Sequence, residues 1–143
     1  MLTLLLNRSR KCSNVKKWLL TTVAFATLLT GCSSNNEEQR QLELMTQHRA
    51  GVLSAGLPIE YGPLSVMRVL AKKNVVEMMM IYNQDAEGAR PLSDVMKNSV
   101  NSYCTNSDVK ANLDMGMVYL IKVRNTRGQL MVEQLISKET CNS

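Results

Sequence analysis

The sequence of 143 residues contains four cysteines and one histidine, the residue types best suited to covalent, redox or metal chemistry. Cys12 and Cys32 lie near the N-terminus, whereas Cys104 and Cys141 lie in the C-terminal part. A zinc site needs several clustered Cys or His ligands, and two distant cysteines with the single His48 do not supply them. A reactive thiol needs a basic partner, and the sequence around Cys104 and Cys141 indicates none. We therefore expect no metal site and no cofactor.

Motifs of known enzyme classes are missing as well. The sequence has no glycine-rich phosphate loop, no Gly-x-Ser-x-Gly and no His-Glu-x-x-His. Its acidic residues are scattered, and no spaced pair suggests acid–base catalysis. A lone histidine in a helix, as expected for His48, is far more often a surface or capping residue than a catalyst. The sequence therefore predicts a protein that is not an enzyme and has no catalytic residues.

The N-terminal residues have the pattern of a secretory signal. Lys16 and Lys17 precede an uncharged, mostly apolar run of 13 residues from Trp18 to Thr30, which is too short to span a bilayer. The run ends in Leu-Thr-Gly-Cys32, which resembles the bacterial lipobox, where the cysteine thiol is diacylated and becomes the mature N-terminus. The alternative is an ordinary signal peptide that happens to contain a cysteine. Residues 1–31 are therefore expected to be a lipoprotein signal peptide.

Lipidation of Cys32 determines where the protein is expected to reside. The two or three acyl chains of a bacterial lipoprotein anchor it stably in a membrane. In such lipoproteins, Asp after the cysteine usually retains the protein at the inner membrane, whereas Ser33 lets the lipoprotein sorting machinery carry it to the outer membrane. We expect an outer-membrane anchor with the body in the periplasm. Apolar residues before the basic cluster leave open a start at Val15, which would exclude Cys12 from the protein.

The net charge of +5 comes from the signal region. Five of the 17 basic residues lie before residue 18, and all 12 acidic residues lie after residue 36. Residues 32–143 therefore carry equal numbers of both charges. A cationic surface for nucleic acid is not indicated.

Cys104 and Cys141 are expected to form a disulfide. Thiols pair in an oxidising compartment such as the periplasm, and these two are the cysteines left in the mature body. The bond would close a loop of about 38 residues and stabilise the fold by roughly 3.5–4 kcal/mol in the loop-entropy model.

The pattern of apolar residues predicts a short polar tether over residues 32–41 and one domain over residues 42–143. Within this region we expect a helix at about 37–54, strands at 64–70 and 75–82 joined by a tight turn, a helix opening at Pro91, a short strand or turn at 109–113, and strands at 115–124 and 130–137. This order indicates an α+β fold: an antiparallel sheet of four to five strands with helices packed on a face.

Nine of the ten methionines lie in the mature body, and three of them are consecutive in the strand at 75–82. Both faces of this strand are mostly apolar, so we expect it to be central and covered. The cover is either the protein's own helices or a partner, because methionine-rich surfaces can accept an apolar helix. Core packing is the simpler interpretation for most methionines. The candidate partner-binding residues are Met78 and Met80 on the sheet and Leu92, Met96 and Val100 on the second helix.

Residues of the C-terminal half, and one motif ahead of the first predicted strand, carry a family resemblance. The residues concerned are Leu57-Pro58-Ile59, Cys104, Asp108-Val109-Lys110, Gly116, Tyr119, Asn125-Thr126-Arg127 and Thr140-Cys141. Together with the lipobox and tether, they resemble the β-type pilotins of type II secretion, the AspS/GspS-beta family. The resemblance implies an outer-membrane lipoprotein that binds a short C-terminal segment of secretin subunits. It would carry them through lipoprotein sorting to the outer membrane, where the secretin channel assembles.

Two other functions compete with this interpretation. Periplasmic lipoproteins that inhibit lysozyme also combine antiparallel sheets with a disulfide, and they carry a Ser-Gly-x-x-Tyr type loop. Here Met115 stands before Gly116-Met117-Val118-Tyr119, which weakens that likeness. An accessory lipoprotein of a pilus or conjugation secretin is the second alternative.

Overall fold

The computed structural model describes residues 33–143, which form five strands and four helices. In chain order these are α2 (Ser33–Ser54), β1 (Ile59–Tyr61), β2 (Leu64–Lys72), β3 (Val75–Tyr82), α3 (Leu92–Thr105), α4 (Ser107–Asp114), β4 (Val118–Arg124), β5 (Leu130–Ile136) and α5 (Lys138–Cys141). The predicted signal peptide and the predicted acylation of Cys32 lie outside the described residues. Glu38–Ser143 form one compact unit.

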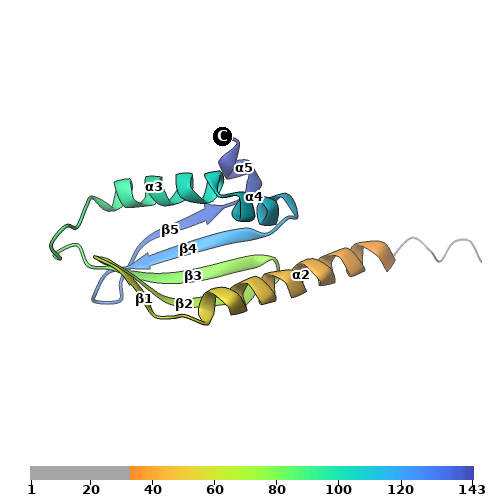
Figure 1. The fold of residues 1–143 in the computed structure, drawn as a ribbon, viewed down its shortest axis with the longest axis horizontal. Coiled ribbons are helices and arrows are strands. Elements are labelled where there is room, and N and C mark those ends of the chain that lie inside the picture. The colour runs from red at the N-terminus through yellow and green to blue at the C-terminus, as the bar shows by residue number, and fades with distance from the viewer. Residues whose placement is uncertain (1–32) are drawn as a thin grey trace, which may run out of the picture. The chain divides into compact units, whose positions relative to one another are not determined.

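The five strands form a single mixed sheet in the order β1-β2-β3-β4-β5 (Figure 1). Neighbouring strands are antiparallel except β3 and β4, whose parallel register runs from Val75 opposite Val118 to Ile81 opposite Arg124. Between these strands the chain crosses over through α3 and α4, as a parallel connection requires. The predicted α+β fold is confirmed, and the sheet is mixed rather than wholly antiparallel. Local alternation of residues predicts strands but not the direction in which they pair.

The core lies between one face of the sheet and the helices. Alternate residues of β3 (Val76, Met78, Met80 and Tyr82) and of β4 (Tyr119, Ile121 and Val123) are buried, while the residues between them are half-buried. Ala50 of α2, Met96 of α3 and Leu113 of α4 belong to the same buried cluster. Helices therefore cover one face of the sheet, and β3 is its central strand, as expected.

Helix α2 is longer than the sequence suggests. It starts at Ser33, so residues 33–41, expected to be a tether, are helical. The side chains of residues 35–41 are exposed, whereas Thr46 and Ala50 of the second half are buried against the core. The Thr46 hydroxyl donates to the Leu42 carbonyl at 2.7 Å, so this polar side chain is satisfied within the helix. The second half of α2 therefore holds the helix on the sheet.

The segment 109–113 is helical, which corrects the expectation of a short strand or turn. The Asn106 side chain caps α4 by accepting hydrogen bonds from the backbone N–H groups of Asp108 and Val109. Val109 and Leu113, four residues apart, are both buried on one side of this helix. The turn after α4 passes through Gly116 at φ +95°, so β4 begins at Val118 rather than at Met115.

A disulfide joins Cys104 to Cys141, which confirms the predicted pair. Their Cα atoms are 5.3 Å apart, and the bond links the end of α3 to the short C-terminal helix α5. The sequence did not indicate α5 or the three-residue strand β1. Both elements are too short to show a periodic pattern of apolar residues.

Candidate partner-binding site

The methionines proposed as partner contacts lie mostly inside the protein. Met78, Met80 and Met96 have exposed fractions of 3%, 9% and 8%, and they belong to the core between sheet and helices. Leu92 and Val100 are half-buried and pack against that core. The protein's own helices cover this face of β3, so core packing accounts for these methionines. Three of the five predicted contact residues are therefore almost inaccessible on the surface of the folded domain.

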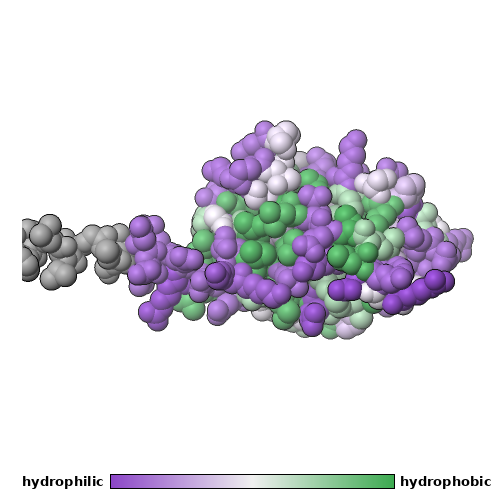
Figure 2. All heavy atoms as spheres, turned by 180° about the vertical axis from the view of Figure 1, so that it is seen from behind, coloured by the Kyte–Doolittle hydropathy of each residue, from purple (hydrophilic) through white to green (hydrophobic). Residues whose placement is uncertain are grey.

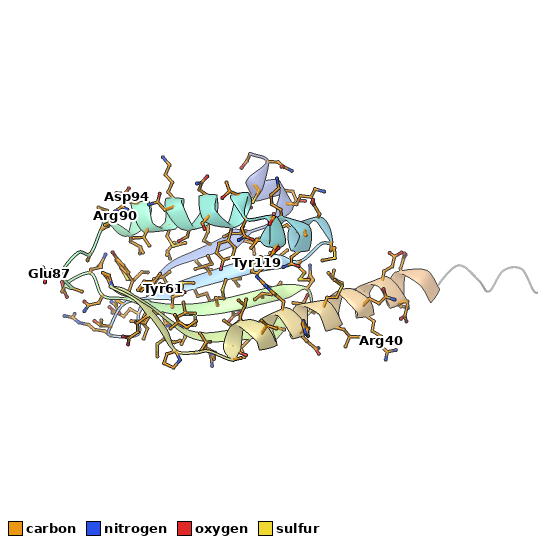
Figure 3. All side chains as sticks on the ribbon, in the orientation of Figure 1. Arg40, Tyr61, Glu87, Arg90, Asp94 and Tyr119 are labelled. Atoms are coloured by element: carbon orange, nitrogen blue, oxygen red, sulfur yellow. A yellow bond between two sulfur atoms is a disulfide. The ribbon has the colours of Figure 1, made fainter. Side chains whose placement is uncertain are left out.

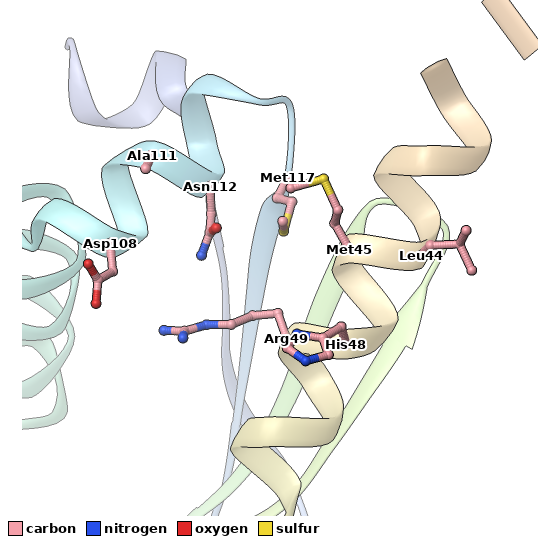
Figure 4. Close-up of a pocket in the computed structure, with 8 residues that line it drawn as sticks. All are labelled: Leu44, Met45, His48, Arg49, Asp108, Ala111, Asn112 and Met117. Carbon is pink, nitrogen blue, oxygen red and sulfur yellow. The ribbon is translucent and has the colours of Figure 1, made fainter. Parts of the chain in front are cut away.

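A groove of about 570 Å³ lies between α2 and α4 (Figure 4). Its walls are formed by Leu44, Met45, His48 and Arg49 of α2, by Asp108, Ala111 and Asn112 of α4, and by Met117. Met45, which is 41% exposed, points into the groove toward Met117, whereas the side chain of Leu44 points away from the groove (Figure 4). The groove therefore combines an open apolar rim with a small number of polar groups, as binding sites commonly do.

Arg49 is the polar residue that stands out in this groove. Its side chain extends from α2 across the groove toward α4 (Figure 4). Its Nε is buried and is the one buried side-chain polar atom without a hydrogen-bond partner within residues 33–143. An unpaired buried donor costs about 1–3 kcal/mol, and more when the group is charged. Nε itself is out of reach of a partner, so a partner would meet the guanidinium through its terminal nitrogens, Nη1 and Nη2, which are not among the buried unpartnered atoms.

Tyr103 lies near enough to Arg49 to feel its charge, and Tyr103 in turn packs against Tyr119. The rings of Tyr103 and Tyr119 meet edge to face at 5.3 Å, and Asn112 Nδ2 donates to Tyr119 Oη at 2.8 Å. Figure 3 shows Tyr119 among the side chains between the sheet and the helices. The Asn112 amide is thus engaged with Tyr119, and no hydrogen bond or ion pair joins Arg49 to Asn112 or Asp108 within the described part of the chain.

Burial, and to a smaller extent Tyr119, raise the pKa of Tyr103 to about 12, and the nearby charge of Arg49 opposes the shift. In the unfolded chain a tyrosine titrates near pH 10. Between about pH 10 and 12 the unfolded chain therefore loses a proton that the folded protein keeps, so the free energy of unfolding should fall with rising pH. Denaturant unfolding at pH 9, 10.5 and 12 measures this slope. Tyr103→Phe should flatten it, and an equally steep slope in that variant would contradict the assignment.

A second depression lies between α3, β5 and α5. Among its lining residues are Met96 and Val100, together with both cysteines of the disulfide. Two of the five predicted contact residues therefore border this depression. Its volume, about 560 Å³, is similar to that of the groove at Arg49. Unlike that groove, it holds no buried polar atom without a partner.

The face of the sheet turned away from the helices is only partly apolar. Figure 2, seen from behind Figure 1, shows apolar patches separated by polar side chains. Leu70 and Leu135 are exposed at 40% and 49%, and they flank Glu77 and Leu120 in one row across the strands. The charges on this face largely pair with one another, because Glu77 Oε2 lies 2.9 Å from Lys72 Nζ and 3.4 Å from Lys122 Nζ.

The features expected of other protein classes are not found in the described residues. Within residues 33–143, no three side chains of His, Cys, Asp or Glu are grouped as a metal ion would require. His48 is exposed at the rim of the groove. No helix from Ser33 onward is both long and apolar enough to cross a membrane. Tyr119 is 1% exposed, so it does not form the exposed loop of a lysozyme inhibitor.

The sequence alone does not identify Arg49 as a site residue, although it contains a signal for it. Arg49 lies on the same helical stripe as Met45 and Val52, where apolar residues are expected to face the core. A charged residue in such a stripe either reaches solvent along its aliphatic stem or meets a partner. Only the position of α4 shows that this arginine borders a groove.

Comparison with known proteins relates the whole described domain to one family. A family model described as the type II secretion system (T2SS) pilotin, S protein, matches residues 38–141. Two solved structures are similar. The pilotin EpsS of the Vibrio vulnificus type 2 secretion system is 56% identical with a TM-score of 0.70, covering 74% of this chain and 96% of its own. The type II secretion system pilotin AspS of Vibrio cholerae is 50% identical with a TM-score of 0.69, covering 76% of this chain and 100% of its own.

A third structure, from Pseudomonas aeruginosa, is 17% identical with a TM-score of 0.63, covering 73% of this chain and 96% of its own, and it shows the fold alone. No curated protein sequence matches the chain.

Proposed function

Because this chain belongs to the type II secretion system pilotin S-protein family, we propose that it is a lipid-anchored pilotin that binds the C-terminal segment of secretin subunits. It directs the sorting and assembly of these subunits in the outer membrane. The observation that carries this proposal is the family match over residues 38–141, which spans nearly the whole compact unit. The family is an accessory of protein secretion rather than a class of enzyme.

Two parts of the chain divide the work in this proposal. Acyl chains on Cys32 supply the membrane anchor, and Ser33 directs the lipoprotein sorting machinery to carry the protein outward. The domain from Glu38 onward binds the secretin. A short segment that orders only when bound, as an amphipathic helix or an added strand, is well suited to a surface groove. The exposed apolar residues on α2 support such a role.

The residue after the acylated cysteine provides a test of piloting. We expect Ser33→Asp to retain the protein at the inner membrane and to retain its secretin there as well. The physical reason is that the sorting machinery no longer extracts the lipoprotein, while the binding domain is unchanged. Fractionation of inner and outer membranes, followed by immunoblotting of both proteins, measures the two locations.

The matched control is Asn36→Asp, which adds the same charge three residues later on the exposed part of α2. This variant should reach the outer membrane together with the secretin. If Ser33→Asp stays at the inner membrane while the secretin still reaches the outer membrane normally, the secretin does not depend on this protein for its location. That result would contradict the piloting function.

A further inference from the structure

Within the described residues, no carboxylate pairs with the guanidinium of Arg49, which reaches into the groove (Figure 4). Asp108, on the opposite wall, forms no ion pair with Arg49, and Asn112 uses its amide to donate to Tyr119. An arginine presents donors in a planar fork that matches a carboxylate. A carboxylate that reaches the terminal nitrogens of Arg49 would therefore complement this unpaired charge.

The surroundings of Arg49 indicate what carries that group. Met45, which is 41% exposed, lies one helical turn before Arg49 on α2, and its side chain points into the groove toward Met117 (Figure 4). Methionine adapts its shape to an apolar partner more readily than branched side chains do. The groove is open to solvent between two helices, so a peptide can lie along it (Figure 4). The complementary ligand is an amphipathic segment with apolar residues beside one acidic side chain.

We propose, on the basis of the function proposed above, that the secretin segment binds in the groove between α2 and α4 and that one of its acidic side chains pairs with Arg49. This assigns a surface and a specific contact to the interaction. The exposed face of the sheet is the less suitable surface, because Glu77, Lys72 and Lys122 already pair with one another there. A partner on that face would have to compete with these ion pairs.

The test measures binding of the secretin C-terminal segment to the processed lipoprotein, purified in detergent, by isothermal titration calorimetry. Arg49→Gln should weaken binding at least tenfold, because a charge-assisted contact in a partly buried site is lost. The affinity of Arg49→Lys should lie between those of the unmodified protein and Arg49→Gln, since lysine keeps the charge but lacks the planar fork of donors. Asp108→Asn should strengthen binding by a few fold, because it removes a like charge from the opposite wall.

The matched control is Arg68→Gln, which removes the same charge from an exposed position. Arg68 stands opposite Met79 on the face of the sheet turned away from the helices. This variant should bind within about twofold of the unmodified protein. Arg49→Gln should unfold at nearly the same temperature, because no hydrogen bond or ion pair of Arg49 within the described residues is lost. If that variant is nevertheless unstable, substitutions in the segment still test the contact.

On the side of the segment, each acidic residue is replaced in turn by its amide, and a separate peptide carries a C-terminal amide. One side-chain substitution should weaken binding to the unmodified protein as much as Arg49→Gln does, and it should have no further effect on Arg49→Gln. If binding is lost only when the C-terminal carboxylate of the segment is amidated, the partner of Arg49 is the chain terminus, and the assignment to an acidic side chain is overturned. Full binding by Arg49→Gln, or a loss with Arg68→Gln instead, would overturn the groove while leaving the pilotin function intact. Failure of the unmodified protein to bind any segment would overturn the function and the groove together.

Discussion

Cells that produce the Cys32→Ala variant are expected to lack this protein in the outer membrane and to mislocalise its secretin. Two or three acyl chains contribute about 0.8 kcal/mol for each buried methylene group, so their loss removes the stable membrane anchor. No helix within residues 33–143 has the length and apolarity to replace it. The expected result is therefore a nearly complete loss from the outer membrane. Membrane fractionation with immunoblotting of both proteins measures it, together with secretion of an exported substrate.

The control for this experiment is Cys12→Ala. It makes the same substitution within the predicted signal region, so it should leave location and secretion unchanged. The two variants together separate acylation of Cys32 from a general effect of cysteine replacement. A secretin that reaches the outer membrane normally in cells with Cys32→Ala would show that the lipid anchor is not what carries it.

Replacing Cys104 with serine is expected to produce the largest loss of stability. The disulfide closes a loop between residues 37 positions apart and connects the end of α3 with α5. Releasing that loop costs roughly 3.5–4 kcal/mol in the loop-entropy model, a large share of the 5–15 kcal/mol typical of a small domain. For a domain of about 100 residues this corresponds to a drop in Tm of roughly 15–30 °C.

Thermal unfolding followed by circular dichroism measures this change. The Cys104→Ser/Cys141→Ser double variant removes the remaining free thiol, and it should unfold at nearly the same temperature as the reduced unmodified protein. Thr105→Ser, a change of similar size at the next position of α3, should leave Tm nearly unchanged. A shift of less than one or two degrees in the cysteine variants would mean that the disulfide contributes little to stability.

The sequence predicts the local features of this fold well because they depend on neighbouring residues. The strand β3 alternates between buried and half-buried positions, and the tight turn after Lys72 pairs this residue with Val75. The pairing of Cys104 with Cys141 follows from an oxidising compartment and the absence of other partners. Each of these inferences needs only a short range of sequence or a count of cysteines.

The features that depend on tertiary arrangement are the ones that the sequence does not reveal. The parallel pairing of β3 with β4 results from the path of α3 and α4 over the sheet, which no local pattern records. Met78 and Met80 face the core because the protein's own helices cover them. Their side chains alone would suit a partner equally well.

The candidate groove likewise depends on the tertiary arrangement of the helices. The sequence predicts a helix around Met45, but only the position of α4 beside α2 places this side chain in a groove. In the sequence, Arg49 resembles any other arginine of a helix. Only the structure shows that its Nε is buried without a hydrogen-bond partner. A binding site built from two helices distant in the sequence therefore requires the structure for its detection.

The central claim is that this protein binds the C-terminal segment of a secretin, and direct binding tests it. The processed, oxidised lipoprotein in detergent is mixed with the C-terminal segment of each secretin encoded by the source genome, with a scrambled segment as the control. Isothermal titration calorimetry should show micromolar or tighter binding to one segment, that of the type II system, and none to its scrambled form. The absence of binding to every segment by protein with a native circular dichroism spectrum would contradict the claim.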